Sequence, residues 1–332
     1  MEEIITLDYG SGGKKTSRLI EEHILPAFDN AVLSELGDGA LLPGTEAIAF
    51  STDSFVVDPL FFPGGDIGKL AVCGTVNDVA MCGAEPKFLS CALILEEGLP
   101  VEILERVLQS MRCSAADAGV QIVTGDTKVV EKGRGDGLYI NTSGIGFKKH
   151  SLSGIQAVRD GDAVLVSGTA GDHGTAIMLA RSGMMSGELK SDCMALNRLT
   201  DAMLSSGAQI RILRDPTRGG LATTLNEFTE GRNFGIELDE SAVPVRPEVT
   251  AACDMLGLDP LYCANEGKLV CICAADSAEL LLEIMRSLPE GRDAAQIGHV
   301  DKSLPGRVVL RTGLGGRRIL QKLAGAQLPR IC

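Results

Sequence analysis

The feature that most limits the fold of this chain is the alternation of strand-like and helix-like segments along both of its halves. Short apolar runs predict strands, at 87–95, 120–130, 136–147, 269–274, 294–300 and 307–310. Longer segments predict helices, most clearly at 101–118 and 276–288. Such alternation is typical of α/β or α+β domains.

A loop-like stretch at 148–154 separates the two halves, and a chain of 332 residues corresponds to about two domains. We therefore predict an N-terminal domain over 1–147 and a C-terminal α/β domain over 148–305. The remainder, 306–332, is predicted to be a C-terminal segment that ends in a mobile tail.

The charge balance argues against several classes of partner. The formal net charge is −13, which disfavours nucleic acid and acidic membrane surfaces. No apolar run is long enough to span a membrane, and the acidic start Met1-Glu2-Glu3 lacks the basic region of a secretory signal. We expect a cytoplasmic protein whose ten cysteines are mostly small core residues.

Four aspartates share one setting. Asp38, Asp53, Asp78 and Asp126 each lie at the end of a strand-like run or inside an apolar segment, with Asn77 beside one of them. Each alone is more often a cap or turn residue. However, a buried carboxylate is costly unless it is paired or bound to a cation, and Mg²⁺ binds carboxylates together with substrate phosphates. Together, the four predict one shared Mg²⁺–nucleotide site.

A glycine-rich turn near the N-terminus also indicates a phosphate ligand. Gly10, Gly12 and Gly13 precede Lys14, where a helix is predicted over 14–28. Such a turn at a helix N-terminus offers free N–H groups to an anion. The spacing is not that of a Walker A loop, and a merely flexible turn explains the segment equally well.

The last residue is a cysteine, Cys332. Chain ends are mobile unless docked; the glycines of 312–316 predict a hinge, and Pro329 stiffens the final residues. One interpretation is a frayed tail with an incidental cysteine, which the tail alone favours. The other is a thiol on a short arm that reaches into a site formed by the rest of the chain.

Three further polar residues lie where elements begin or end. Asp66 is predicted to N-cap a helix that runs to about Gly83. His173 is predicted to be a helix-start residue, because nothing nearby in the sequence orients it as a base. Three roles are open to Glu266, which precedes a strand: a cap, a partner of Lys268, or a general base.

Several motifs together resemble one superfamily. They are the glycine-rich start, Asp38, Ser51-Thr52-Asp53-Ser54, Phe62-Pro63-Gly64-Gly65-Asp66-Ile67-Gly68, Thr75-Val76-Asn77-Asp78-Val79-Ala80, Thr124-Gly125-Asp126-Thr127 and Asp215-Pro216-Thr217-Arg218-Gly219-Gly220. This set resembles the aminoimidazole-ribonucleotide-synthetase, or PurM-like, superfamily of ATP-using enzymes. With Pro329-Arg330-Ile331-Cys332 at the extreme C-terminus, the chain resembles the HypE family over essentially its whole length. These are the carbamoyl dehydratases of [NiFe]-hydrogenase maturation.

The resemblance implies a PurM-like two-domain fold, with a β-rich, ATP-binding N-terminal domain that forms a homodimer and a C-terminal α/β domain with a mobile tail. It implies ATP and Mg²⁺ as cofactors. A partner carbamoyltransferase (HypF) would load a carboxamide onto the terminal thiol, and this protein would dehydrate it to a thiocyanate with ATP. The cyano group would then pass to iron held by a HypC–HypD complex.

The chemistry and the resemblance together assign roles to residues. Cys332 is the acceptor, Glu266 the expected base and Lys128 the expected stabiliser of negative charge on oxygen; the reverse assignment of Glu266 and Lys128 stays open. Arg330 is expected to dock the tail against a carboxylate. The residues expected to bind ATP are Gly10, Gly12, Gly13, Lys14, Asp53, Asp66, Asn77 and Asp126. The expected Mg²⁺ ligands are Asp38, Asp53, Asp78 and Asp126.

Two alternatives remain beside this enzyme. One is another PurM-like synthetase or kinase, although a selenophosphate synthetase is disfavoured because the first cysteine, Cys73, lies well past the glycine-rich turn. The other is a non-catalytic carrier or scaffold for the carbamoyl or cyano group. ATP hydrolysis that depends on a carbamoylated Cys332 would separate enzyme from carrier.

Overall fold

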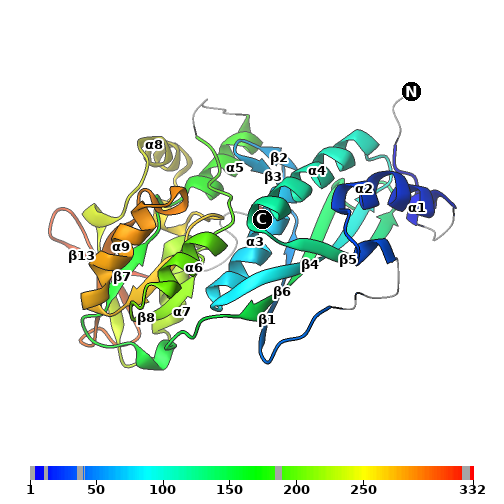
Figure 1. The fold of residues 1–332 in the computed structure, drawn as a ribbon. Coiled ribbons are helices and arrows are strands. Elements are labelled where there is room, and N and C mark those ends of the chain that lie inside the picture. Colours follow the sequence, from blue (N-terminus) through cyan, green and yellow to red (C-terminus); the bar gives the residue numbers. More distant parts are fainter. Residues whose placement is uncertain (1–3, 11–13, 36–39, 41, 184–188, 324–329) are drawn as a thin grey trace.

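The computed structural model describes the chain except residues 1–3, 11–13, 36–39, 41, 184–188 and 324–329. Three predicted site residues, Gly12, Gly13 and Asp38, lie outside the described residues. The chain forms two parts side by side, each built on its own sheet (Figure 1). The predicted two-domain fold of mixed sheets and helices is therefore confirmed.

The first sheet has the strand order β1-β6-β4-β5. Its strands are β1 (Ile48–Phe55), β4 (Ala84–Glu96), β5 (Gln121–Val130) and β6 (Leu138–Lys148). Neighbours are antiparallel except β4 and β5, which run parallel. Side chains along β1 and β6 alternate between a face covered by helix α3 and a more exposed face.

Helix α3 (Ile67–Met81) lies between the two parts of the molecule. As predicted, Asp66 caps it, because its carboxylate accepts the N–H groups of Gly68 (2.7 Å) and Lys69 (3.1 Å). The helix is buried nearly all round, as expected for one that packs on every side. It contacts β1, β4, β6 and helix α4 (Val101–Ala118) of its own part, and α6 (Asn197–Ser205) and β8 (Ile210–Arg214) of the second part.

The second sheet has the order β13-β12-β9-β11-β7-β10-β8. Its strands are β7 (Ala163–Val166), β8 (Ile210–Arg214), β9 (Gly235–Asp239), β10 (Val270–Cys273), β11 (Ala295–Asp301), β12 (Val308–Arg311) and β13 (Arg317–Leu320). Alternate residues of β7 join two different cores: Val164 packs with α7 on one face, and Leu165 packs with α6 and α9 on the other. Helices therefore cover both faces, as in an α/β domain.

The helices of the second part are α5 (Asp172–Ser182), α6 (Asn197–Ser205), α7 (Gly220–Thr229), α8 (Pro247–Leu256) and α9 (Ala278–Arg286). Helix α5 packs on α8 and reaches the short hairpin β2 (Phe61–Phe62) and β3 (Gly65–Asp66) of the first part. Near the N-terminus, α1 (Lys14–Leu19), a π-helical turn (Ile20–Ile24) and α2 (Leu25–Phe28) form the helix predicted over 14–28.

The structure differs from the sequence expectation near the C-terminus. The glycines of 312–316 form the turn of the hairpin between β12 and β13, where Thr312 donates its N–H to the Gly316 carbonyl (2.8 Å). The prediction of a hinge there is wrong, because β13, which the sequence analysis does not predict, pairs with β12. The second sheet consequently extends past the predicted boundary at residue 305.

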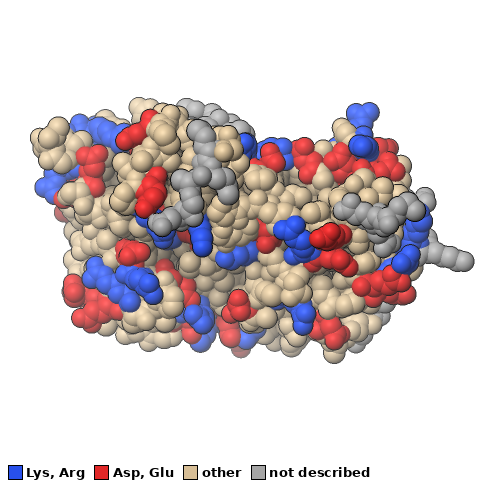
Figure 2. Space-filling view, turned by 90° about the horizontal axis from the view of Figure 1, so that it is seen from above, with Lys and Arg blue, Asp and Glu red and all other residues tan. Residues whose placement is uncertain are grey.

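Among the described residues, no helix is both long and apolar enough to cross a membrane. On the face seen in Figure 2, acidic and basic side chains are interspersed. That face therefore presents no extended basic surface of the kind that nucleic acid requires.

Candidate functional site

The last three residues are docked where the two parts of the molecule meet. Val56, which follows β1, donates its N–H to the Cys332 carbonyl (3.0 Å). Ile331 is 2% exposed and belongs to the core of the first part. The imidazole of His173, on α5 of the second part, lies 2.6 Å from the Ile331 carbonyl oxygen. For 330–332, the structure therefore agrees with an arm that reaches into a site and not with a frayed tail.

Arg330 fixes the direction from which the tail approaches. Its φ is +54°, in the left-handed region that non-glycine residues seldom occupy. Its side chain pairs with Asp136 (2.7 Å) and donates to the Val56 carbonyl (3.2 Å). Its own carbonyl accepts the Asp58 N–H (3.2 Å) and Nη2 of Arg181 (2.7 Å). Arg330 thus docks the tail against a carboxylate, as expected.

Docking buries the Cys332 thiol where the charge of Glu266 acts on it. Burial, reinforced by the charge of Glu266, raises the pKa of the Cys332 thiol to about 12, while Arg218 acts in the opposite direction. The thiolate, not the thiol, is the nucleophile. The docked thiol therefore holds less of the thiolate form than an ordinary cysteine.

Glu266 is a residue of this site with an unused polar atom, as is Asp172, whose Oδ1 has no partner among the described residues. It is buried, and its Oε1 has no hydrogen-bond partner among the described residues. Burial, followed by the charges of Asp215 and Asp192, raises the pKa of Glu266 well above its ordinary value. A carboxyl with a raised pKa in an enclosed site is suited to proton transfer, and the orphan oxygen indicates a ligand group that is not part of the chain.

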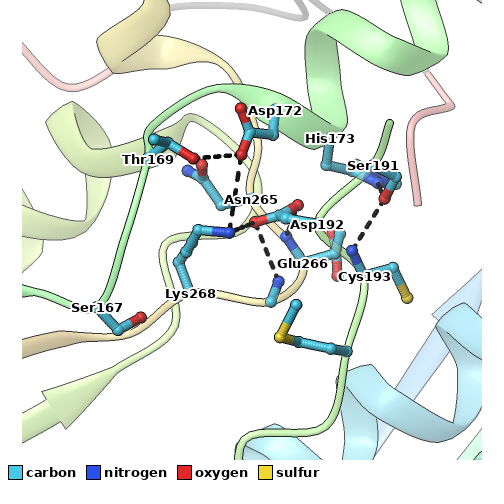
Figure 3. Close-up of polar contacts among 12 residues, drawn as sticks. Ser167, Thr169, Asp172, His173, Ser191, Asp192, Cys193, Asn265, Glu266 and Lys268 are labelled. Carbon is cyan, nitrogen blue, oxygen red and sulfur yellow. Dashed lines mark hydrogen bonds and ion pairs between the residues drawn. The ribbon is translucent and has the colours of Figure 1, made fainter. Parts of the chain in front are cut away.

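A buried ion pair holds the main chain of Glu266. The Asp192 carboxylate accepts the N–H groups of Glu266 (3.1 Å) and Gly267 (3.3 Å) and pairs with Lys268 Nζ (3.1 Å). Lys268 lies between Asp192 and Asp172 (Figure 3), 3.8 Å from the latter. Burial opposes ionisation of Asp192, but Lys268 and its other partners lower the pKa overall. Lys268 thus pairs with Asp192 and not with Glu266.

Three carboxylates, besides Asp192, act electrostatically on Glu266. They are Asp53 on β1, Asp78 on α3 and Asp215 after β8. Burial, with Asp78 contributing, raises the pKa of Asp53; burial, with Asp78 again contributing, raises the pKa of Asp215 to about 7. Ser51 donates its hydroxyl to Asp78 (2.7 Å). Uncompensated carboxylates of this kind fit a hard divalent cation.

The cluster of Asp53, Asp78 and Asp215 does not enclose a metal by itself. In the described part of the chain, three ligand atoms lie within 4.8 Å of one another only at Glu237, His299 and Asp301 on the second sheet. A cation at the aspartate cluster would therefore need further oxygens, and ATP phosphates supply such oxygens.

Asp126 and Lys128 are not brought to this cluster. Through the pairing of β1 with β6, β6 with β4 and β4 with β5, Asp53 lies in register with Gly125, so these two positions share one face of the sheet. The next residue, Asp126, therefore points to the opposite face. Asp126 and Lys128 pair with each other (2.7 Å), with side chains 61% and 64% exposed. Within one chain, Asp53 and Asp126 therefore lie on opposite faces of the sheet, and Asp38 lies outside the described residues. The sequence does not give the register that separates Asp53 from Asp126, and a single site for the four aspartates stays a prediction.

Asn77 connects the two parts of the molecule. Its buried amide donates to the Met194 carbonyl (3.1 Å) and accepts the Leu196 N–H (2.7 Å). The same nitrogen lies 3.5 Å from the Glu266 carbonyl oxygen. In this structure the Asn77 side chain therefore bonds to main chain of the second part, and it positions the segment that precedes α6.

Two glycines enclose the segment at Ser191 and Asp192. A Cβ at Gly64, whose φ is +94°, would lie 2.5 Å from the Ser191 carbonyl oxygen. A Cβ at Gly267 would lie 1.8 Å from the Asp192 carbonyl oxygen. Only glycine permits such close approach of two backbones. The segment is thus held between a loop of the first part and a loop of the second.

A separate cavity of about 260 Å³ lies between the N-terminal helices and β5. Ile20, Ile24 and Phe28 line one side, and Gly125 and Thr127 line the other. Gly10 ends a short 3-10 helix, and Lys14 begins α1. The glycine-rich turn that contains Gly12 and Gly13 falls outside the described residues.

Asp215, Asp192 and Arg218 are not among the site residues predicted from the sequence. Asp215 and Arg218 belong to a motif that was noted, and an aspartate between a strand and a proline is a signal that a carboxylate stands at a strand end. Asp192 carries no local signal, because its partners are 74 to 76 residues away. For the same reason, the partners that orient His173 were not found.

Comparison with known proteins identifies both halves of the chain. Residues 29–147 match the family described as AIR synthase related protein, N-terminal domain, and residues 159–311 match AIR synthase related protein, C-terminal domain. A curated relative, carbamoyl dehydratase HypE of Cupriavidus necator, is 51% identical over 333 residues, which cover 99% of this chain and 95% of the relative.

Two solved structures are also similar. A crystal structure of hydrogenase maturation protein HypE in complex with ATP has a TM-score of 0.94 and 51% identity, and the match covers 98% of this chain and 99% of the other. A crystal structure of a HypE–HypF complex has a TM-score of 0.80 and 48% identity, covering 92% of this chain and 99% of the other.

Proposed function

This chain belongs to the HypE family of carbamoyl dehydratases, and we propose that it converts an S-carboxamide on its own Cys332 into an S-cyanate with the use of ATP. The cyano group would be the one supplied to the iron of [NiFe] hydrogenase. The observation that carries the proposal is the docked tail. The charge of a buried carboxyl, Glu266, acts on the Cys332 thiol, and Oε1 of Glu266 has no partner among the described residues.

The reaction removes one water from S–C(=O)–NH₂. The amide oxygen is a poor leaving group until it is phosphorylated, and this explains the need for ATP. The oxygen attacks the γ-phosphorus and ADP leaves; the O-phosphorylated carbon then loses phosphate as the nitrogen loses its protons. The carboxamide and ATP thus give the S-cyanate, ADP, hydrogen phosphate and one proton. Such phosphoryl transfer depends mainly on positioning and charge neutralisation.

We assign proton removal from the amide nitrogen to Glu266. Its raised pKa makes its carboxylate a stronger base near neutral pH than an ordinary glutamate. Its main chain is fixed by the Asp192–Lys268 pair, so the carboxyl has a defined position. Lys128 remains our candidate for stabilising the negative charge on oxygen.

Our candidates for holding Mg²⁺ are Asp53 and Asp78, together with Asp215. Burial and mutual repulsion raise the pKa of Asp53 and Asp215, and a hard cation would offset that repulsion. When bound, Mg²⁺ would offset the negative charge of the carboxylates and the triphosphate. Asp126 also stays a proposed ligand for ATP or Mg²⁺, although within one chain it lies on the other face of the sheet.

We propose that ATP lies along the glycine-rich turn and extends from the cavity beside β5 toward the aspartates. The apolar lining of that cavity suits a nucleobase, and Gly10 and Lys14 flank the turn that would cover the phosphates. Asp66 and Asn77 would support this site from α3, where one caps the helix and the other bonds to main chain.

A homodimer completes the proposal. The exposed face of the first sheet carries Ile48, Phe50 and Ile94, which are 57%, 64% and 42% exposed, and exposed apolar patches of this kind mark interfaces. A HypF-type carbamoyltransferase would load the undocked thiol, and a HypC–HypD complex with iron would receive the cyano group, all in the cytoplasm.

The test is the intact mass of the full-length protein after loading by its carbamoyltransferase, before and after addition of Mg-ATP. We expect the mass of one water to be lost from the C-terminal peptide, and no change in Cys332→Ala. A carboxamide that survives Mg-ATP would contradict the enzyme and leave a carrier.

A further inference from the structure

The docked tail is held by an imidazole whose proton can be located. His173 is 0% exposed; its Nε2 lies 2.6 Å from the Ile331 carbonyl oxygen and its Nδ1 lies 2.8 Å from Ser191 Oγ. A carbonyl oxygen only accepts, so Nε2 must carry the proton. Burial lowers the pKa of His173, which keeps the ring neutral. Nδ1 therefore accepts the Ser191 hydroxyl, whose oxygen in turn accepts the Cys193 N–H (3.0 Å).

We propose that His173 is the positioning residue that recognises the docked tail, with its Nε2–H holding the Ile331 carbonyl and Ser191 fixing the tautomer that makes this possible. In this arrangement His173 does not touch the reacting atoms. It sets the place at which the Cys332 sulfur is presented to Glu266. This inference rests on the proposed function, in which the sulfur carries the carboxamide.

The other donors that hold the tail bind other carbonyl groups than that of Ile331. The Arg330 carbonyl is bound by Asp58 and Arg181, and the Cys332 carbonyl by Val56. The Ile331 carbonyl belongs to a residue that is 2% exposed, and loss of its donor would leave a buried acceptor unsatisfied. Such a loss should raise the ratio of undocked to docked tail by about 5- to 150-fold.

The same short segment also contacts the proposed base. Ser191 orients His173, and the next residue, Asp192, accepts the N–H groups of Glu266 and Gly267 (Figure 3). One rigid segment therefore fixes both the donor that holds the tail and the carboxyl that acts on its cargo. The distance between thiol and base is set by this segment and by neither end alone.

Three substitutions separate hydrogen bonding from packing. Glutamine can place an N–H near the position of Nε2, whereas asparagine imitates Nδ1, and phenylalanine keeps a ring against Phe62, which meets His173 edge-on at 5.6 Å. We expect His173→Asn and His173→Phe to expose the tail, and His173→Gln to stay closest to the wild type. A role in packing alone would reverse this order, with His173→Phe the mildest.

The measurement is the rate at which iodoacetamide labels Cys332 in the unloaded full-length protein, followed by peptide mass mapping because Cys82 and Cys113 are also exposed. We expect labelling of Cys332 to rise by about 5- to 150-fold in His173→Asn and His173→Phe. After loading, the single-turnover dehydration rate should fall in the same order, with the ATP dependence unchanged. His150→Gln and His150→Phe are matched controls, since His150 bonds to Asp201 (2.8 Å) away from the tail.

Equal labelling of Cys332 in all His173 variants and the wild type would overturn the proposal, as would a glutamine variant that labels as fast as the phenylalanine variant. If the His173 variants do not fold, Ser191→Ala tests the same relay, with a smaller rise in labelling expected. Labelling needs no carboxamide. If the His173 variants label in the predicted order but the loaded wild type fails to dehydrate, the proposed function is contradicted and the tail contact still stands.

Discussion

The two sides of the candidate site are built in opposite ways. Around the tail, His173, Asp192 and Lys268 are buried and bonded in a continuous network that reaches both the terminal residues and Glu266. On β5, Asp126 and Lys128 are more than half exposed and pair with each other. The tail side is preorganised for one peptide, which lowers the cost of docking. In the proposal above, ligands or a second chain would complete the nucleotide side.

The sharpest way to test this contrast is Glu266→Gln. It keeps the shape of the tail side but removes the proposed base, so we expect the single-turnover dehydration rate to fall by about 10²- to 10⁴-fold, measured by intact mass. Loading of Cys332 should be unaffected. Glu290→Gln is a matched control, because Glu290 also has a buried oxygen without a partner but pairs with Arg198 (2.8 Å).

Lys128→Met probes the other side. If Lys128 stabilises charge on the reacting oxygen, the dehydration rate should fall by about 10²-fold, while iodoacetamide labelling of Cys332 stays at the wild-type rate. Lys132→Met, at an exposed residue in the turn after β5, is the control. A change in labelling would show that Lys128 belongs to the tail side, and the contrast between the sides would be lost.

Asp215→Asn should change how stability depends on pH. The folded protein raises the pKa of Asp215 from 3.8 to about 7, chiefly by burial. It therefore retains a proton that the unfolded chain releases, and this group's contribution to stability falls as pH rises from about 4 to 7. Without Mg²⁺, we expect the melting temperature of the variant to match the wild type at pH 4 and exceed it by a few degrees (about 2–4 °C per kcal/mol) at pH 8.

Differential scanning fluorimetry across this pH range is the measurement. Asp254→Asn, at an exposed position on α8, should show no such trend. A variant whose melting temperature keeps a constant offset from the wild type would mean that Asp215 is not protonated more readily in the folded state.

Phe50→Asp should have the smallest effect on the tail side. A charge on the exposed face of the edge strand β1 should dissociate the proposed dimer, as judged by light scattering. Labelling of Cys332 should not change, because the tail contacts lie within one chain. Met255→Asp, at a residue 69% exposed on the second part, is the control. A wild type that is monomeric at every concentration would refute the dimer directly.

The elements that the sequence predicts well are those set by neighbouring residues. Asp66 caps α3 and the helix over 101–118 has the predicted bounds, because caps and helical periodicity are local. Even the docking of Arg330 on a carboxylate follows from its charge alone.

What the sequence could not give depends on distant pairings. His173 and Ile331 are 158 residues apart, so an imidazole that looks unoriented in the sequence is oriented by the end of the chain. Asp126 shares a local pattern with Asp53, but the register of the sheet turns it to the opposite face. Local patterns thus identify candidate side chains, whereas the tertiary fold decides which of them meet.

The close approach of Gly64 and Gly267 to Ser191 and Asp192 has a consequence for the order in which the site and the tail form during synthesis. Gly64 and Gly267 come from different parts of the molecule, so the segment between them is seated only when both parts have formed. Contacts of such long sequence separation form late in folding. Cys332 follows both glycines in the sequence, so it is made after all of these residues. Its thiol therefore meets a site whose components already exist, and it enters as a substrate would.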